Sequence, residues 1–484
     1  MHLESSFLMR AASVVLFAAM NAACFGQVTW KRVFGAFDHD VAYDIVRTSA
    51  EEYVVVGSTG SFGNGSSDVY LFKVDSNGVR LWSKTYGAMQ VDGGKALVET
   101  SDGGFVIAGS TNRNTTNGYD GLLLKVGPSG DPEWERTYGG PDWDLFNDVA
   151  LTADGGLLAV GQTYSEGVGG DAWIVRLDAA GDTLWTSHFG ASGEDEANSI
   201  ISTLDGGAAW TGSVNDRSDA EVVKLDETGL IEWEIQVGGD SMEIGRDIIQ
   251  TLDGGYSVVG ATKSFASVVE QYHFKLDGSG SFQWEKHWGQ VNHQEGFKHV
   301  QLPTGEYAAI GKVFGFGAGG SDMFLLKSDV NGDFILGQTQ GGEDDEEGFA
   351  LIRSYAGYVL CGVTESYGAG LDDIFLVKTN EIGFTDSDDV LTTFDPLTTN
   401  DLTSSSVSSL TLFPSPSSGP LTVRADERLR ELAIWDVTGR QVFEQRSQGL
   451  DVRLDLDLPD GTYVLTATTV QGQVLRQAFI LQRP

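Results

Sequence analysis

Short runs of alternating apolar and polar residues, separated by turns rich in glycine and aspartate, fill most of the chain. Nearly the same sequence motif recurs as TSDGGFVIAGST at 100–111, TADGGLLAVGQT at 152–163, TLDGGAAWTGSV at 203–214 and TLDGGYSVVGAT at 251–262. The Asp-Gly-Gly triplet supplies residues that tolerate positive φ in a tight hairpin, and the alternating run after it is typical of a strand. No long stretch shows a 3.6-residue apolar period, so the sequence predicts an all-β protein.

Two further markers recur with this turn. A basic residue near the end of a strand-like run returns every 48 to 52 residues, at Lys73, Lys125, Arg176, Lys224, Lys275, Lys327 and Lys378. A tryptophan follows nine residues later in five units, at Trp82, Trp134, Trp185, Trp233 and Trp284. Residues 28–384 therefore divide into seven units averaging 51 residues, each with four strand-like runs. This pattern predicts a closed seven-bladed β-propeller with four strands per blade.

The composition changes after Gly383. Residues 385–409 are rich in serine, threonine and aspartate and have no apolar period, which predicts a flexible linker. Residues 410–484 contain new strand-like runs and predict a small C-terminal β-sandwich.

The C-terminal segment carries an ordered series of motifs. Its members are Pro414, Pro416 and Gly419, then Asp436, Gly439 and Arg440, then Gly461 and Tyr463, and finally Arg476. In this order they resemble the type A C-terminal sorting domain of type IX secretion cargo, although Ser415 stands where that family usually has asparagine. The resemblance implies that these residues form the sorting signal and that the type IX secretion machinery is a partner. It also implies that the tail is usually cleaved and that the passenger stays on the outer cell surface or is released.

The repeats over 28–384 resemble propeller units that are common in secreted proteins of Bacteroidota-like bacteria. This resemblance implies an architecture and leaves the activity open.

The N-terminus predicts a signal peptide over residues 1–26. One arginine, an apolar run and small residues up to Gly26 follow Met9, and Met9 is an alternative start because Glu4 does not suit the basic end of a signal. No other stretch is long and apolar enough to form a transmembrane anchor. Cleavage after Gly26 removes Cys24 and leaves Cys361 as the one thiol. Alternatively, Cys24 is a lipidation site.

The charge narrows the possible partners. The chain has 69 acidic and 31 basic side chains, giving a formal net charge of -38. Such a surface repels phosphate backbones and anionic lipids, so we do not expect nucleic-acid binding.

One acidic ring recurs with the repeat, five residues after the glycine that ends each tryptophan run. Its members are Asp40, Asp92, Asp144, Asp195, Glu243, Gln294 and Glu346. Carboxylates around one axis suit Ca²⁺, which prefers oxygen ligands; alternatively, each side chain caps its own turn. A dense acidic run joins the ring in the last unit, so the candidate calcium ligands are Asp144, Asp195, Glu243, Glu343, Asp344, Asp345 and Glu346. We expect no cofactor, with Ca²⁺ as the alternative.

A second ring stands five residues before each basic marker and comprises Asp68, Asp120, Asp171, Asp219, Glu270, Asp322 and Asp373. Aspartate is favoured at the start of a strand, so we interpret this ring as structural. His287, His293 and His299 lie six residues apart, a spacing that matches no zinc pattern, and we interpret them as surface residues with a metal site as the alternative.

The sequence shows no nucleophile elbow, P-loop, dinucleotide fingerprint or CxxC pair. We therefore predict a non-catalytic, surface-exposed or secreted propeller that binds a glycan, a protein or a cation through its loops. The first alternative is a carbohydrate-active enzyme, either a glycoside hydrolase or a polysaccharide lyase, with carboxylates near the axis. The second alternative is a structural protein of the cell coat.

Overall fold

The computed structural model describes residues 29–484 except 114–117, 167–168, 191–192, 290–291, 387–389, 395–409, 414–419, 426–427, 437–440, 447–448, 457, 460, 471–473 and 482–484. The expected signal peptide, Cys24 and most of the expected linker therefore lie outside the described residues. Among the described residues, no helix is long and apolar enough to cross a membrane.

The described strands of residues 30–379 form seven sheets, in which strands that follow one another in the chain mostly pair as antiparallel hairpins. The first sheet has β2 (Asp40–Arg47), β3 (Tyr53–Thr59), β4 (Asp68–Val74) and β5 (Arg80–Tyr86), and the second has β6 (Asp92–Glu99), β7 (Phe105–Thr111), β8 (Asp120–Val126) and β9 (Pro132–Tyr138). The third has β10 (Asp144–Leu151), β11 (Leu157–Thr163), β12 (Gly169–Leu177) and β13 (Thr183–Phe189), with the short β14 (Gly193–Glu194) paired to β12. The fourth has β15 (Glu196–Ser202), β16 (Ala208–Val214), β17 (Asp219–Leu225) and β18 (Ile231–Val237).

The remaining sheets follow the same plan. The fifth has β19 (Glu243–Gln250), β20 (Tyr256–Thr262), β21 (Glu270–Leu276) and β22 (Phe282–Trp288), and the sixth has β23 (Gln294–Gln301), β24 (Tyr307–Phe314), β25 (Ser321–Ser328) and β26 (Phe334–Gln340). The seventh combines β27 (Glu346–Ser354), β28 (Gly357–Thr364) and β29 (Asp373–Thr379) with β1 (Trp30–Gly35) from the start of the chain.

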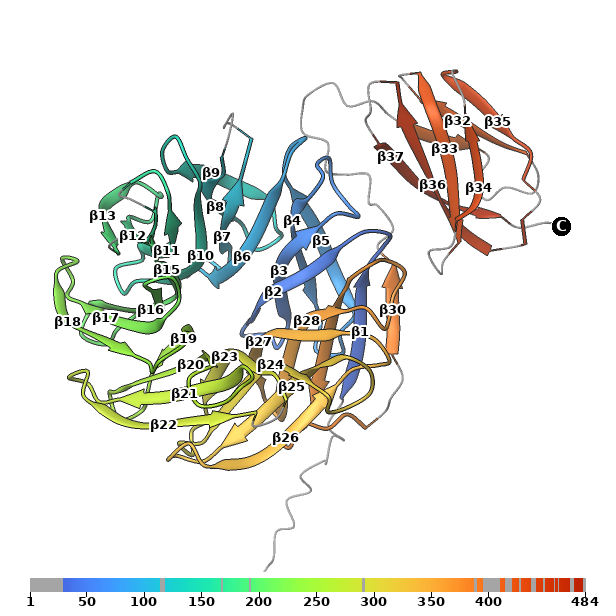
Figure 1. The fold of residues 1–484 in the computed structure, drawn as a ribbon. Helices are drawn as coiled ribbons and strands as arrows, with labels where there is room; N and C mark the ends of the chain where they lie inside the picture. The colour runs from blue at the N-terminus through green and yellow to red at the C-terminus, as the bar shows by residue number, and fades with distance from the viewer. Residues whose placement is uncertain are drawn as a thin grey trace, which may run out of the picture.

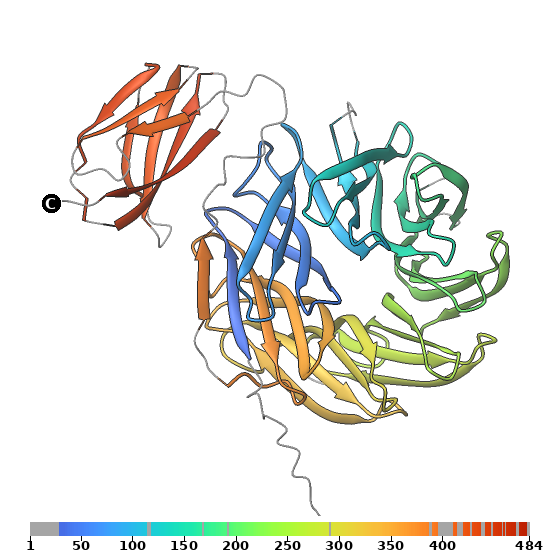
Figure 2. The ribbon, with the colours of Figure 1, turned by 180° about the vertical axis from the view of Figure 1, so that it is seen from behind.

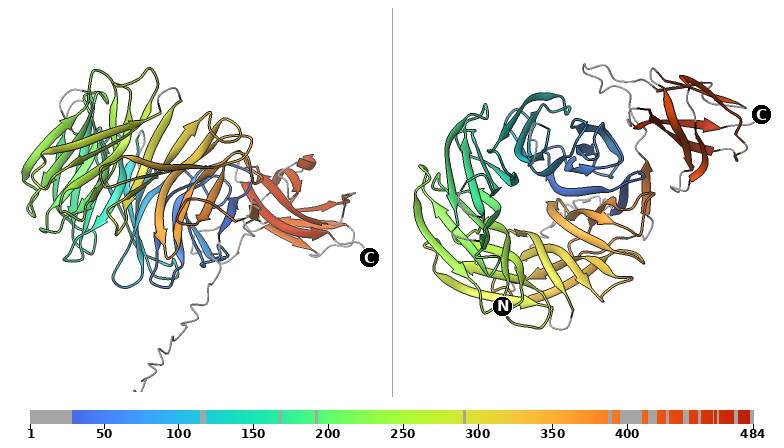
Figure 3. Two further views of the ribbon diagram at one scale, coloured as in Figure 1. Left: turned by 90° about the horizontal axis from the view of Figure 1, so that it is seen from below. Right: turned by 45° about the horizontal axis from the view of Figure 1, so that its top comes forward.

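The sheets succeed one another around a ring (Figure 1; the reverse view is Figure 2). The first strand of each sheet contacts the first strand of the next, through β2, β6, β10, β15, β19, β23 and β27, and β27 contacts β2. First strands therefore line the inside of the ring, where Figure 1 labels them. Figure 3 shows the ring from two further sides. The predicted all-β class and propeller arrangement are confirmed.

The middle strands carry the core and the outer strands face solvent. Every residue of β20 is buried, whereas alternate residues of β22 are exposed. A fully buried strand needs a nearly continuous apolar run such as YSVVGAT, and a half-buried strand needs alternation such as FQWEKHW. Neighbouring sheets share apolar clusters, as where Val258 of the fifth sheet packs with Val222 of the fourth.

The recurring tryptophans pack against the next sheet. A Cβ added at Gly280, in the last hairpin of the fifth sheet, would lie 2.7 Å from the ring of Trp233 in the fourth. Gly280 has φ +80°, which favours glycine. Because glycine has no Cβ, it also leaves room for the Trp233 ring that the turn covers. The tryptophan and the turn glycine therefore recur at the same period.

The two ends of the repeat region meet in the seventh sheet. Strand β1 pairs antiparallel with β29, with Trp30 opposite Lys378, and so supplies the outer strand that other sheets take from their own unit. Strand β30 (Val390–Phe394) then pairs in parallel with β1. Strand β30 lies within residues 385–409, where the sequence predicts a flexible linker, and the open edge of β1 offers it backbone partners.

The C-terminal segment forms two further sheets. One contains β31 (Leu410–Phe413), β32 (Leu421–Ala425) and β35 (Asp451–Leu454); the other contains β33 (Leu429–Asp436), β34 (Gln441–Arg446), β36 (Gly461–Thr469) and β37 (Val474–Leu481). Leu421 and Val423 of the first sheet share one buried cluster with Leu432 and Leu465 of the second. This segment therefore has a hydrophobic core of its own.

Candidate functional site

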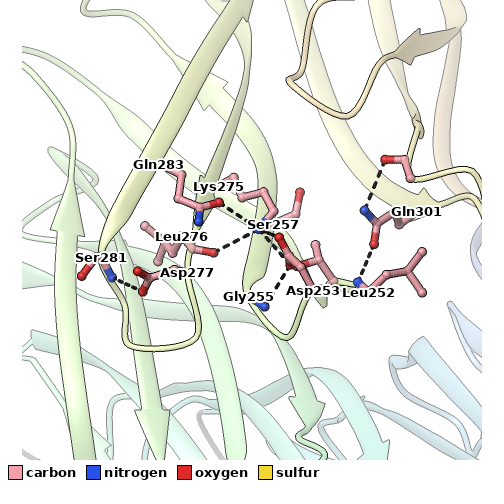
Figure 4. Close-up of polar contacts among 12 residues, drawn as sticks. Leu252, Asp253, Gly255, Ser257, Lys275, Leu276, Asp277, Ser281, Gln283 and Gln301 are labelled. Atoms are coloured by element: carbon pink, nitrogen blue, oxygen red, sulfur yellow. Dashed lines mark hydrogen bonds and ion pairs between the residues drawn. The ribbon is translucent and has the colours of Figure 1, made fainter.

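The recurring basic residues bind the recurring turns. In the fifth sheet the Nζ atom of Lys275 lies 2.8 Å from Oδ2 of Asp253 and 3.0 Å from Oε1 of Gln283 (Figure 4). Equivalent pairs join Lys125 to Asp102, Arg176 to Asp154 and Lys224 to Asp205. These side chains connect the third strand of a sheet to its first hairpin and belong to the scaffold.

The first acidic ring is buried, and most of its members accept bonds from nearby turns. The carboxylate of Glu243 accepts hydrogen bonds from the amide of Gly239 at 2.7 Å and from the hydroxyl of Thr262 at 2.6 Å. Glu346 accepts the equivalent bonds from Gly342 and Thr364 at 2.7 and 2.6 Å. This geometry agrees with the turn-capping alternative.

The other two candidate calcium ligands of the ring follow the same rule. Asp144 accepts hydrogen bonds from the amide of Gly140 at 2.7 Å and from the hydroxyls of Thr163 and Ser165. Asp195 accepts a bond from the amide of Asn215 at 2.7 Å. Both carboxylates are buried.

The dense acidic run is divided between surface and interior. Glu343, Asp344 and Asp345 are exposed, whereas Glu346 is buried. Asp345 accepts a 2.6 Å bond from the amide of Ser321. In the part of the chain that the structure describes, no three or more His, Cys, Asp or Glu residues gather in a way that would hold a metal ion. Calcium binding at these residues stays a prediction.

The two acidic rings meet at the junctions between sheets. A Cβ added at Gly341 would lie 2.2 Å from Oδ1 of Asp322 and 2.3 Å from Oε2 of Glu346, so the two carboxylates face the same glycine. Burial, followed by the charge of Glu346, raises the pKa of Asp322 to about 6. Burial also raises the pKa of Asp373, which faces Asp40 across Gly35, to about 7. These junctions hold two acids where a single proton relieves the repulsion.

The histidine-rich stretch does not behave as one surface patch. His287 and His293 are partly exposed, with Nδ1 of His287 2.8 Å from Glu270 and Nε2 of His293 2.7 Å from Glu295. His299 is 1% exposed, so its interpretation as a surface residue is wrong. Strand β23 turns this side chain into the junction between the fifth and sixth sheets.

His299 belongs to a buried polar network that the sequence did not predict. Its Nδ1 lies 2.7 Å from Oδ2 of Asp247, and its Nε2 lies 3.0 Å from Oγ of Ser257, which also lies 2.7 Å from Nε2 of His273. The series resembles a Ser-His-Asp arrangement, but a nucleophile must reach its substrate and Ser257 is fully buried. The network therefore satisfies buried polar groups.

Polar residues also converge from equivalent positions of the inner strands. The amine of Lys298 lies 2.5 Å from Oδ1 of Asp44. Burial opposes the charge of Lys298, and Asp44, Asp148 and Asp247 outweigh that effect and raise its pKa. Each aspartate also accepts a backbone N–H from the next sheet, from Leu97, Ile200 and His299 respectively. The three carboxylates therefore cap backbone groups of the next sheet, and Asp44 also pairs with Lys298.

A cavity of about 350 Å³ lies between β9 of the second sheet and β12 and β13 of the third. Its lining includes the rings of Tyr138, Trp173 and His188 and the polar side chains of Ser165, Glu166 and Thr186. Because aromatic rings and polar side chains both line it, this cavity is a candidate site for a small ligand.

The structure describes four of the nine residues of the expected sorting signal. Asp436 lies in β33, Gly461 and Tyr463 lie in β36, and Arg476 lies in β37. Tyr463 is buried, stacks on Phe479 at 5.7 Å and donates a 2.8 Å bond to the carbonyl of Pro459. Pro414, Pro416, Gly419, Gly439 and Arg440 lie outside the described residues.

The C-terminal segment matches a known family. Residues 411–482 match the secretion system C-terminal sorting domain, which confirms the resemblance found in the sequence. The domain indicates that the type IX secretion machinery recognises this chain and exports it to the cell surface or the extracellular space.

Other similarities are distant. The regulatory protein FlaEY of Caulobacter vibrioides is 26% identical over 163 residues, which cover 28% of this chain and 17% of that protein. PorZ, an essential surface component of the type IX secretion system of Porphyromonas gingivalis, aligns with a TM-score of 0.42 and 12% identity over 93% of this chain and 60% of its own. The WD40 domain of Neurospora crassa Pan2 aligns at 0.45 and 14% over 71% of this chain and 91% of its own. A puromycin hydrolase aligns at 0.46 and 12% over 80% of this chain and 59% of its own.

Proposed function

We propose that this protein is an exported binding or adhesion protein without catalytic activity: a seven-bladed β-propeller over 28–384, preceded by a signal peptide at 1–26 and joined by a linker at 385–409 to a sorting domain at 410–484 that folds as a small β-sandwich. The sorting domain carries the proposal, because it brings the propeller to the outside of the cell. Its ligand is a glycan or a protein that contacts the loops between strands. Loops at one end of a rigid ring vary freely without weakening the core.

The polar chemistry near the axis supports binding over catalysis. Glycoside hydrolysis uses two carboxylates that flank the scissile bond at a defined separation. Here Asp44, Asp148 and Asp247 each accept a backbone N–H group of the next sheet, and Asp44 also pairs with Lys298. Carboxylates that accept backbone N–H groups of a neighbouring sheet stabilise the packing of the sheets in the ring.

The export step is tested by disrupting the sorting domain alone. Leu465 is fully buried in the core of that domain, so L465D should unfold the domain and leave the propeller intact. Arg453 has an exposed side chain, and R453D serves as the matched control. In a bacterium with type IX secretion, we expect the wild type and R453D outside the cell and L465D inside. Export of L465D at the wild-type level would contradict the proposal.

The absence of catalysis is tested with the exported protein itself. Incubation with plant and bacterial polysaccharides, followed by mass spectrometry, should reveal no new reducing ends or unsaturated products. Polysaccharides that are retained in a pull-down and released unchanged would support binding. Turnover that is lost in D148N would favour the carbohydrate-active enzyme.

A further inference from the structure

The cavity over Trp173 lies where the scaffold of other sheets is filled. Four sheets share a turn after their second strand that contains threonine, any residue, and serine. In each turn the serine amide donates to the threonine hydroxyl, at 3.1 Å for Ser61, 3.2 Å for Ser165, 3.2 Å for Ser264 and 3.1 Å for Ser366. Because the turns have the same bonds, the residue after each serine occupies the same place: Phe62, Glu166, Phe265 and Tyr367 respectively.

In three of these sheets that residue is aromatic and covers an aromatic side chain of the third strand. Phe62 lies 5.5 Å from Tyr70 at 37°, Phe265 lies 6.0 Å from Tyr272 at 38°, and Tyr367 lies 5.7 Å from Phe375 at 40°. The third sheet has Trp173 at the equivalent strand position and Glu166 in place of the aromatic cover. Phe146 stacks on the indole at 4.7 Å and 17°, and the cavity also borders the indole.

The fifth sheet shows what fits such a space. His287 stands opposite Tyr272 as His188 stands opposite Trp173. The ring of Phe265 stacks on the imidazole of His287 at 4.5 Å and 9°. In the third sheet His188 is exposed and borders the cavity. The corresponding space therefore accepts a six-membered ring lying flat on the histidine.

The polar lining specifies the chemistry of that ring. The hydroxyl of Thr183, the imidazole of His188 and the carboxylate of Glu166 border the cavity. The hydroxyls of Ser165 and Thr186 also border it, but they already donate to Asp144 and to the carbonyl of Ile174. The net charge of -38 disfavours an anionic ligand. A pyranose has an apolar face that packs on aromatic rings and equatorial hydroxyls that bond to such a rim.

We propose that this cavity binds a neutral pyranose ring, which takes the place that Phe62, Phe265 and Tyr367 fill in other sheets. The inference rests on the proposed role of the propeller in binding and names its ligand class. Glu166 accepts hydrogen bonds from the sugar hydroxyls, and the exposed imidazole of His188 provides the stacking surface beside the edge of the buried Trp173.

The test uses calorimetric titration of the full-length protein with glucose, galactose, mannose, N-acetylglucosamine and their β-linked disaccharides. We expect saturable binding of at least one of these sugars. E166F should weaken sugar binding at least tenfold, because phenylalanine at this position would fill the cavity as Phe62 and Phe265 do in the first and fifth sheets. E227F places the same residue on an exposed hairpin of the fourth sheet and should leave the affinity unchanged. H188A, which removes stacking surface without filling the cavity, should also weaken binding.

The outcomes separate this inference from the broader proposal. Sugar binding that E166F and H188A leave unchanged would overturn the cavity as its site and keep the propeller as a binding protein. No binding of any of these sugars would overturn the ligand class, while export and pull-down still test the proposed function. Unfolding midpoints measured for each variant show whether a loss of binding follows from a loss of fold.

Discussion

The amine of Lys275 lies 2.8 Å from the carboxylate of Asp253, which connects the third strand of a sheet to the hairpin that starts its second strand. The lysine side chain is 5% exposed and the aspartate side chain 58% exposed, so the pair is anchored from the inside. Equivalent pairs in the second, third and fourth sheets explain why the Asp-Gly-Gly turn and the basic residue recur together.

Removing the inner partner of this pair should destabilise the ring. K275M leaves Asp253 and Gln283 without the amine that they bind, and we expect a loss of ~1–3 kcal/mol in the free energy of unfolding. K286A breaks the more exposed pair of Lys286 with Asp333 and should cost about 0–1 kcal/mol. Urea unfolding of both variants measures the difference, and equal effects would contradict the anchoring role.

Alanine in place of a turn glycine should destabilise the protein more where a side chain packs against that glycine. Gly280 and Gly254 have φ values of +80° and +82°, so alanine strains both by ~1 kcal/mol. A Cβ at Gly280 also meets the Trp233 ring at 2.7 Å, whereas a Cβ at Gly254 meets nothing within 4 Å. We therefore expect G280A to lower the melting temperature more than G254A does. The reverse order would contradict the packing of tryptophan beneath the next turn.

Stability should fall as the pH rises from 4 to 7. The folded-state pKa values of Asp322 and Asp373 are raised to about 6 and about 7, while an unfolded aspartate titrates near ~4. The folded protein thus binds more protons in this window, so the stabilisation is complete below pH ~4 and is lost as the pH passes the folded values. D322N carries no charge and should flatten this dependence and raise stability at pH 8. Thermal unfolding from pH 4 to 8 measures both effects, and a wild-type stability that rises through this window would refute the assignment.

The thiol of Cys361 should be inert until the ring opens. The residue is fully buried in the seventh sheet, and burial raises its pKa above the ordinary thiol range. A thiolate is the reactive form, so a buried and protonated thiol reacts slowly. We expect no labelling by a thiol reagent in the folded protein and full labelling in urea. Rapid labelling without denaturant would show that the seventh sheet opens readily.

The repeat could be predicted because each unit carries its own local signals. Asp-Gly-Gly turns, alternating strands and the basic marker lie within one unit, so the sequence alone indicates the hairpins. The cavity could not be predicted in the same way, because Glu166 reads as an ordinary loop residue. Its meaning depends on Phe62 and Phe265 covering aromatic side chains, a contact that spans a loop and a strand.

The contacts between sheets could not be predicted from the sequence either. Ser257, His299 and Asp247 meet although 42 residues separate the serine from the histidine and 52 separate the histidine from the aspartate. The curvature of the ring sets this meeting, and no motif marks it. The period of the acidic rings is evident in the sequence, but only the folded arrangement pairs Asp322 with Glu346 across Gly341.

The central claim is that the C-terminal domain carries the propeller out of the cell, and an antibody against the propeller tests it most directly. Intact cells and medium from a bacterium with type IX secretion are compared for the full-length chain and a chain that ends at residue 409. We predict labelling of intact cells or medium for the full-length chain, and labelling only after permeabilisation for the shortened one. Equal labelling of both chains without permeabilisation would contradict the account.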